Sequence, residues 1–145
     1  MSGGGYDHQN IFAKILNGDI PSHKVYEDEH NLAIMDVMPR GQGHVLVMPK
    51  APSRNILDIG AHDLQNLIVA VQQVARAVKK AFDADGVTIA NYGEVAGGQS
   101  VFHTHFHVIP RFDGVALKPH AGKMEDPELL SDQAFKIRAV LGGQA

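Results

Sequence analysis

The pattern that most constrains the fold is a long amphipathic stretch in the middle of the chain, from residue 61 to residue 82. Its apolar side chains recur at steps of three and four residues, which places them on one face of an α-helix. They are Leu64, Leu67, Ile68, Val71, Ala75, Val78 and Phe82. Polar residues such as Gln72, Arg76 and Lys79 occupy the other side. We therefore predict one long helix whose apolar face packs against another layer.

Short apolar segments on both sides of this helix predict the strands of that layer. Three precede the helix and two follow it, at 24–27, 32–36, 44–48, 87–91 and 102–110. The connections within the first group are short, which favours antiparallel pairing. We predict an α+β domain in which a five-stranded antiparallel sheet packs under the long helix.

Two shorter helices complete the predicted organisation. Asn10 is a suitable N-cap for a short helix that ends at Gly18. Asp126 and Pro127 begin a C-terminal helix that extends to about residue 141. We expect residues 1–9 to form a flexible lead and residues 10–111 the domain. Residues 112–145 would be a C-terminal extension packed on that domain.

Composition excludes several classes of function. A chain of 145 residues with 44% hydrophobic residues has the size of one domain. A net charge of −3 argues against nucleic-acid binding, and no apolar run reaches the roughly 18 residues that span a bilayer. There is no cysteine for thiolate catalysis, disulfides or cysteine-based zinc sites. Because the first residues lack the parts of a signal peptide, we expect a cytoplasmic protein.

Three histidines alternate along the last predicted strand. His103, His105 and His107 occupy every second position of an apolar run. Successive side chains of a strand point to opposite faces, so a strand here would place all three imidazoles on one face. The sequence therefore predicts a histidine cluster on this sheet.

Such a cluster has three interpretations. The histidines could be surface residues, they could hold zinc, or one imidazole could attack phosphorus while the others bind oxygens or donate protons. The preceding loop, residues 91–100, favours phosphate because its glycines expose backbone N–H groups and Asn91, Gln99 and Ser100 add donors. The run contains no carboxylate to orient zinc ligands. We favour a metal-free phosphate site and keep zinc as the alternative.

The stretch from Gly98 to Pro110 resembles the signature of the histidine-triad (HIT) superfamily. Further segments follow in the order that this family uses. They are 11–15, 18–21, 25–28, 36–39 and 43–50. The resemblance covers roughly residues 10–111 and is greatest to the histidine-triad nucleotide-binding (Hint) branch. It implies a HIT-like fold.

The resemblance also implies a role for each polar residue near the triad. His105 would be the nucleophile that forms a covalent nucleotidyl-histidine intermediate. His107 would contact the α-phosphate, and His103 would orient the nucleophile from behind. The remaining polar positions would be His44 in the same cluster, Ser100 as donor to the leaving group, Gln99 beside it, and Asn91 on the phosphate.

By the same resemblance, the nucleoside would bind in an apolar slot. Asp36 would accept both ribose hydroxyls, which favours ribonucleotides. The base would lie among Ile11, Phe12, Ile15, Ile34 and Val37. Without the resemblance, the residues of the first helix would be assigned to core packing and Asp36 to a turn.

Cofactor and partner expectations follow from the same source. Many bacterial relatives hold a structural zinc at positions that here are Asn10, Ala13 and Pro52, so we expect that zinc to be absent and no cofactor to be required. The resemblance implies a homodimer formed through the long helix and a central strand. In relatives the tail approaches the partner's active site, so we expect residues 117–123 to influence the choice of leaving group.

The expected activity is hydrolysis of the P–N bond of purine nucleoside 5′-phosphoramidates, with release of a nucleoside monophosphate. Two alternatives remain. One is a dinucleoside polyphosphate hydrolase, and the other is a nucleotide-binding or signalling module whose turnover is incidental.

Overall fold

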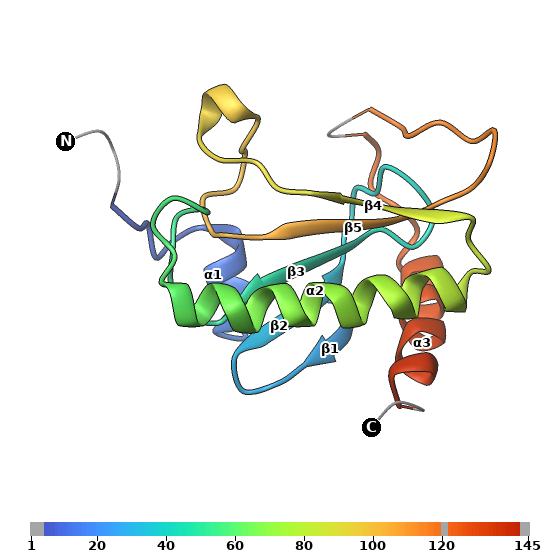
Figure 1. Ribbon diagram of the computed structural model, residues 1–145, viewed down its shortest axis with the longest axis horizontal. Coiled ribbons are helices and arrows are strands. Elements are labelled where there is room, and N and C mark those ends of the chain that lie inside the picture. Colours follow the sequence, from blue (N-terminus) through green and yellow to red (C-terminus); the bar gives the residue numbers. More distant parts are fainter. Residues whose placement is uncertain (1–4, 120–121, 143–145) are drawn as a thin grey trace.

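A computed structural model describes residues 5–119 and 122–142 of the chain. The expected lead therefore lies partly outside the described residues, as do two positions of the expected specificity segment. The elements are α1 (Ile11–Leu16), β1 (Lys24–Glu27), β2 (Asn31–Met35), β3 (Val45–Pro49), α2 (Ala61–Ala81), β4 (Gly86–Ala90), the 3₁₀ helix η1 (Val95–Gly97), β5 (Phe106–Arg111) and α3 (Pro127–Gly142) (Figure 1). Among the described helices, none has the length and apolarity needed to cross a membrane.

The five strands form one antiparallel sheet in the order β1-β2-β3-β5-β4. This confirms the predicted α+β class. The last strand of the chain lies inside the sheet, where His107 is opposite Leu46 of β3 on one side and Ala90 of β4 on the other. The edges of the sheet are β1 and β4.

Side chains alternate between the two faces of the sheet and form two apolar clusters. On one face, Ala33, Val47 and Val108 pack with α2 and α3, and Figure 1 shows α2 running across the front of the sheet. On the other face, Leu46 and its neighbours pack with Phe12 of α1. His107 is opposite Leu46 on β3, so its side chain projects toward the α1 face.

The long helix has the predicted extent but a slightly different buried face. Its buried residues are Leu67, Ala70, Val71, Val74, Ala77 and Val78. Ile68, which the periodicity placed with the inward residues, is 46% exposed. The sheet packs against this row of small and branched side chains of α2. Ile68 lies outside the row and faces the surface.

The last strand is shorter than predicted, and this corrects the proposed geometry of the triad. β5 begins at Phe106, not at residue 102, so His103 and His105 lie in the loop before the strand and only His107 is a strand residue. The pairing ends here because the last β3 partner is Val47 opposite Phe106 and the last β4 partner is Ala90 opposite His107. In the loop, the Thr104 backbone N–H donates to the Ser53 carbonyl at 3.0 Å instead of to a strand.

Candidate active site

A cavity of about 320 Å³ lies on the α1 face of the sheet. It brings together most of the residues expected to form the site. Of these, the lining includes Ile11, Phe12, Ile15, Ile34, Asp36, Val37, His44, Ser100, His105 and His107. One wall is apolar and comes from α1 and β2, whereas the polar groups come from the ends of strands and the loop before β5. Three expected site residues, His103, Asn91 and Gln99, lie behind this lining.

The ring of His105 is held in one tautomer. Its Nδ1 lies 2.6 Å from the carbonyl oxygen of His103. A carbonyl can only accept, so Nδ1 carries the proton and Nε2 keeps its lone pair. Burial lowers the pKa of His105, which favours the neutral ring. An imidazole with an unprotonated Nε2 is chemically able to act as a nucleophile.

A second chain of hydrogen bonds sets the tautomers of His44 and His107. The backbone N–H of Arg40 donates to Nδ1 of His44 at 3.0 Å, so the proton of neutral His44 is on Nε2. That Nε2 lies 2.9 Å from Nδ1 of His107 and donates to it. Neutral His107 therefore carries its own proton on Nε2, which makes that nitrogen a donor.

A tight turn places His44 at the start of β3. Gly43 has a φ of +77°, and a Cβ there would lie 2.6 Å from Cε2 of Phe82. Only glycine combines this backbone conformation with such a close approach. Because His44 follows directly, the packing of Gly43 on Phe82 fixes where the polar chain begins.

Asp36 is a buried carboxyl on the wall of the cavity. Its Oδ1 accepts the backbone N–H of Met38 at 2.9 Å, and its Oδ2 is 3.5 Å from Nε2 of His44. Burial raises the pKa of Asp36 to about 6, although the Met38 hydrogen bond lowers it. A ligand that offers hydroxyl donors would stabilise the ionised form.

Asp36, His44 and His107 also form a possible metal-binding group, because one ligand atom of each lies within 4.8 Å of the others. The hydrogen bonds do not fit that use. A metal on Nε2 of His44 would need its lone pair, but the Arg40 N–H already occupies Nδ1 and leaves the proton on Nε2. At a second position, where relatives were expected to hold a structural zinc, the Asn10 side chain caps α1 by accepting from the Ala13 N–H; the absence of that zinc stays a prediction.

His103 lies behind His105 and is fully buried. Its Nε2 donates to the Pro49 carbonyl at 2.8 Å, and its own carbonyl is the acceptor for His105. The Phe12 ring packs edge-on against both imidazoles, at centroid distances of 6.4 Å and 4.8 Å. Burial lowers the pKa of His103 to about 4, so the ring is neutral at pH 7. His103 therefore contacts His105 without lining the cavity.

Gln99 and Asn91 hold the loop and do not line the cavity. The Gln99 amide donates to the carbonyls of Arg54 and Val101 at 2.7 Å and 3.0 Å. Both of its N–H groups are therefore engaged, which leaves none for the phosphate that the loop pattern suggested. Asn91 donates to the backbone carbonyl of His105 at 2.8 Å. Both amides position the residues that face the cavity.

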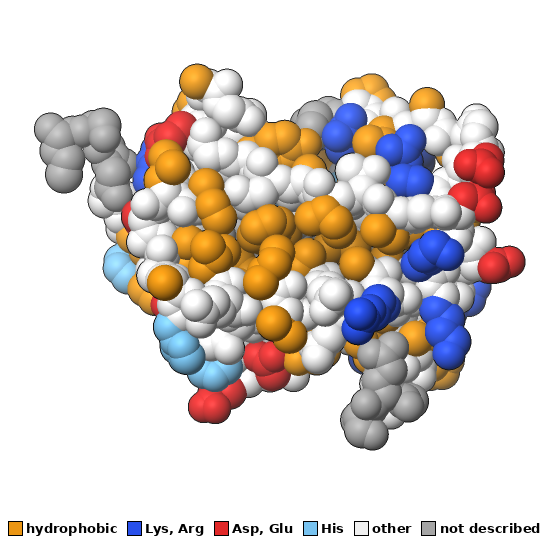
Figure 2. All heavy atoms as spheres, viewed as in Figure 1, with side chains coloured by type: hydrophobic (Ala, Val, Ile, Leu, Met, Phe, Trp, Pro, Cys, Tyr) orange, Lys and Arg blue, Asp and Glu red, His pale blue; other side chains and the backbone are white. Residues whose placement is uncertain are grey.

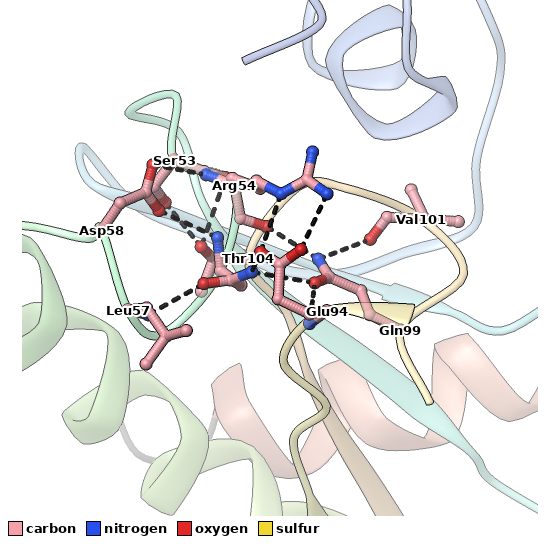
Figure 3. A network of polar contacts seen from close by, with 9 residues as sticks. Ser53, Arg54, Leu57, Asp58, Glu94, Gln99, Val101 and Thr104 are labelled. Atoms are coloured by element: carbon pink, nitrogen blue, oxygen red, sulfur yellow. Dashed lines mark hydrogen bonds and ion pairs between the residues drawn. The ribbon is translucent and has the colours of Figure 1, made fainter. Parts of the chain in front are cut away.

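An ion pair that the sequence pattern does not reveal supports this loop. Arg54 donates to both carboxylate oxygens of Glu94 at 2.9 Å, and Asn55 donates to the same carboxylate at 2.6 Å (Figure 3). Hydrogen bonds from Arg54 and Asn55 lower the pKa of Glu94 to about 2. The Arg54 guanidinium also lies 4.3 Å from the centroid of Phe102. The one signal in the sequence was an acidic residue within a glycine-rich loop.

The geometry defines a class of protein in which a neutral histidine with an unprotonated Nε2 and a donor histidine lie beside an apolar cavity. The HIT domain family matches residues 17–114. The chain is 43% identical over 134 residues to Protein hit of Bacillus subtilis, covering 87% of this chain and 92% of that protein. The chain belongs to the HIT family.

Solved structures agree with this assignment. A Hit-like protein from Bartonella henselae has a TM-score of 0.89 and 50% identity, covering 93% of this chain and 98% of that one. A histidine triad nucleotide-binding protein from Sulfolobus tokodaii has a TM-score of 0.83, 31% identity and 91% coverage of both chains. A HIT family hydrolase from Clostridium thermocellum has a TM-score of 0.66 and 31% identity, covering 75% and 96%.

Proposed function

We propose that this protein is a nucleotide hydrolase or nucleotidyl transferase that acts at the α-phosphorus, and that its substrates are purine nucleoside 5′-phosphoramidates. The observation that carries the proposal is the hydrogen bond from His105 Nδ1 to the His103 carbonyl, which leaves the other ring nitrogen of a buried, neutral imidazole unprotonated. The likeness to a HIT family hydrolase and to a histidine triad nucleotide-binding protein supports the same class.

The proposed reaction has two displacements. Nε2 of His105 attacks phosphorus, a bond between this nitrogen and phosphorus forms, and the P–N bond to the amine breaks. The leaving nitrogen takes up a proton through the Ser100 hydroxyl and departs as the amine. Water then attacks phosphorus and the bond to His105 breaks, while one proton of the water returns to Ser100 and the other is released to solvent. The product is a nucleoside monophosphate.

The other cavity residues would bind and orient the substrate. His107 carries its proton on Nε2 and would donate to a phosphate oxygen. Ser100 lines the cavity and would donate to the leaving group. Asp36 would accept the ribose hydroxyls, and the apolar wall from α1 and β2 would hold the base. No step uses a metal ion.

A dinucleoside polyphosphate is the second candidate substrate. Arg40 is the one Lys or Arg side chain among the described residues that line the cavity. A guanidinium there would attract further phosphates on the leaving side. Turnover of the two substrate classes separates these candidates.

The test compares the wild type with His105→Asn on an adenosine 5′-phosphoramidate and on diadenosine polyphosphates, with and without chelator. We expect phosphoramidate turnover to survive chelator and to fall at least about a thousandfold in the variant. His62→Asn, at an exposed position of α2, is the matched control. Full activity of His105→Asn would refute the mechanism, and loss with chelator would restore the metal interpretation. A wild type that binds nucleotide without turnover would identify a binding module.

We also propose that the chain is a homodimer. Figure 2 shows an apolar band across the face that carries α2 and the edge strand β4. Its exposed members include Ile68, Val69, Val87 and Ile89. An unpaired strand edge beside a contiguous apolar surface is typical of an interface. Ile89→Lys should yield a monomer in sedimentation, whereas Val115→Lys should not. A wild-type mass near 15.7 kDa would refute the dimer.

A further inference from the structure

The N-terminal segment contacts the catalytic cluster through Tyr6. Its hydroxyl lies 2.5 Å from Nδ1 of His103, and the two rings meet edge-on at a centroid distance of 5.6 Å. Tyr6 belongs to the stretch that the sequence indicated as a flexible lead. No role follows for it from the sequence pattern or from the family resemblance.

The direction of this hydrogen bond follows from the other side of the imidazole. Nε2 of His103 faces the Pro49 carbonyl and must carry the proton, so Nδ1 is an acceptor and the Tyr6 hydroxyl is the donor. Burial raises the pKa of Tyr6, which keeps its phenol protonated. Both nitrogens of a fully buried ring are thereby satisfied, and His103 is held in one tautomer and one orientation.

The orientation of His103 bears directly on the nucleophile. The carbonyl of His103 accepts the proton of His105 Nδ1, and the Phe12 ring packs on both imidazoles. A change in the His103 ring would therefore disturb the acceptor and the packing that hold His105. Tyr6 itself does not line the cavity, so it has no direct route to the substrate.

We propose that Tyr6 is a positioning residue for the nucleophile His105, acting through its hydrogen bond to His103. The proposal rests on the proposed function, since it assumes that His105 is the nucleophile. The Tyr6 hydroxyl thus fixes the ring of His103, and the His103 carbonyl fixes the tautomer of His105. Nε2 of His105 remains available for attack.

Tyr6→Phe removes the hydroxyl and keeps the ring. We expect kcat for the phosphoramidate to fall by about three- to tenfold, which corresponds to the loss of one hydrogen bond to a buried group. KM should stay within about twofold, because the cavity wall is unchanged. Tyr26→Phe is the matched control, since it removes a hydroxyl bonded to Asp28 on β1 and should change neither constant.

Nitrogen-15 NMR of the imidazoles gives a readout that a general loss of packing around the site would not reproduce. The titratable groups packed on His103 are Tyr6 and His105, and His8 packs on the Tyr6 ring. In Tyr6→Phe, the Nδ1 signal of His103 should move toward that of an imidazole nitrogen that accepts no hydrogen bond. Its pH midpoint should rise because the neutral ring loses a stabilising hydrogen bond. Tyr26→Phe should leave both unchanged.

Two results would overturn the proposal. One is an unchanged kcat in Tyr6→Phe, and the other is a reduced kcat while the Nδ1 signal and midpoint of His103 stay at their wild-type values. An inactive wild type would overturn the proposed function and with it the catalytic role of Tyr6. The His103 spectra would then decide separately whether the hydroxyl contact exists, so the two failures are distinguishable.

Discussion

The histidines of the site form two pairs that the protein holds in different ways. His107 lies on β5 between two strands and His44 directly precedes β3, so the sheet ladder determines their positions. His103 and His105 lie in a loop, where side chains and carbonyls from distant segments hold them. The sheet pair includes His107, whose Nε2 carries the donor proton, whereas the loop pair includes His105, the proposed nucleophile. The proposed nucleophile is therefore held by contacts with other segments and not by the sheet ladder.

The largest expected effect comes from disturbing the sheet pair at its turn. Gly43→Ala would add a Cβ 2.6 Å from Phe82 at a residue whose φ is +77°. Because both the close contact and the backbone conformation are unfavourable, we expect the free energy of unfolding to fall by about 3 kcal/mol. Gly114→Ala is the matched control, because its φ is +81° but no atom lies within 4 Å of the added Cβ. It should cost about 1 kcal/mol. Equal losses in urea unfolding would show that packing on Phe82 contributes nothing.

The second effect tests the support of the loop pair. Gln99→Ala removes the amide that joins the loop to Arg54, Val101 and Glu94. Buried carbonyls and an N–H lose their partners, so we expect a loss of about 2 kcal/mol together with a reduced kcat. Gln65→Ala, on the exposed side of α2, should change neither by more than about 0.5 kcal/mol. A loss of stability without any change in kcat would mean that the network does not position the nucleophile.

The third expected effect is a gain in stability, and it concerns the Asp36 carboxyl beside the sheet pair. The folded pKa of Asp36 is about 6, above the ordinary value for aspartate. The folded state therefore binds the Asp36 proton more tightly than the unfolded state does. The contribution of Asp36 to the free energy of unfolding falls as the pH rises from about 4 to 6. Asp36→Asn should be more stable at pH 7 by about 1–3 kcal/mol, and nearly equal to the wild type at low pH.

Stability and binding should separate in that variant. Asp36→Asn loses the negative acceptor proposed for the ribose hydroxyls, so nucleotide affinity should fall while the protein becomes more stable. Unfolding curves at pH 4 and pH 7 and calorimetric titration with a nucleoside monophosphate check both. A stability difference that does not change with pH would refute the assigned shift.

The smallest expected effect concerns the contact between the C-terminal extension and Arg40, which lines the cavity. Nε of Arg40 donates to the Lys118 carbonyl, and Lys118 N–H donates to the Arg40 carbonyl, each at 2.8 Å. Arg40→Gln should cost about 0.5 kcal/mol, because the side-chain bond is exposed. Its backbone N–H still orients His44. We expect the rate on diadenosine polyphosphates to fall relative to the phosphoramidate, and an unchanged ranking would exclude a role for this guanidinium in selecting the leaving group.

The C-terminal extension also contacts its own chain. Lys118 is bonded to Arg40, while the expected influence of residues 117–123 on the choice of leaving group in a partner stays a prediction. Glu125 N–H likewise donates to the Val37 carbonyl at 2.9 Å. The extension therefore braces the segment that carries Asp36 and Val37 within one chain.

Much of the fold could be predicted because it depends on local periodicity. The three- and four-residue spacing around Leu67 and Val71 identified α2, and Asn10 capped α1 as expected. The alternation at Phe106, His107 and Val108 also gave the correct faces. What failed was the start of β5, since a strand needs partners as well as a pattern, and none pairs before Phe106.

The sequence by itself determined the α+β class, the family and many of the residues around the cavity, because these follow from spacing and motif. Only the tertiary structure decided the tautomers of His44, His103 and His107, that Gln99 supports the loop, and that Tyr6 reaches His103. Each of these depends on hydrogen bonds between residues far apart in the chain. Periodicity describes a residue's neighbours along one element, whereas a tautomer depends on the atom that folding brings to the ring.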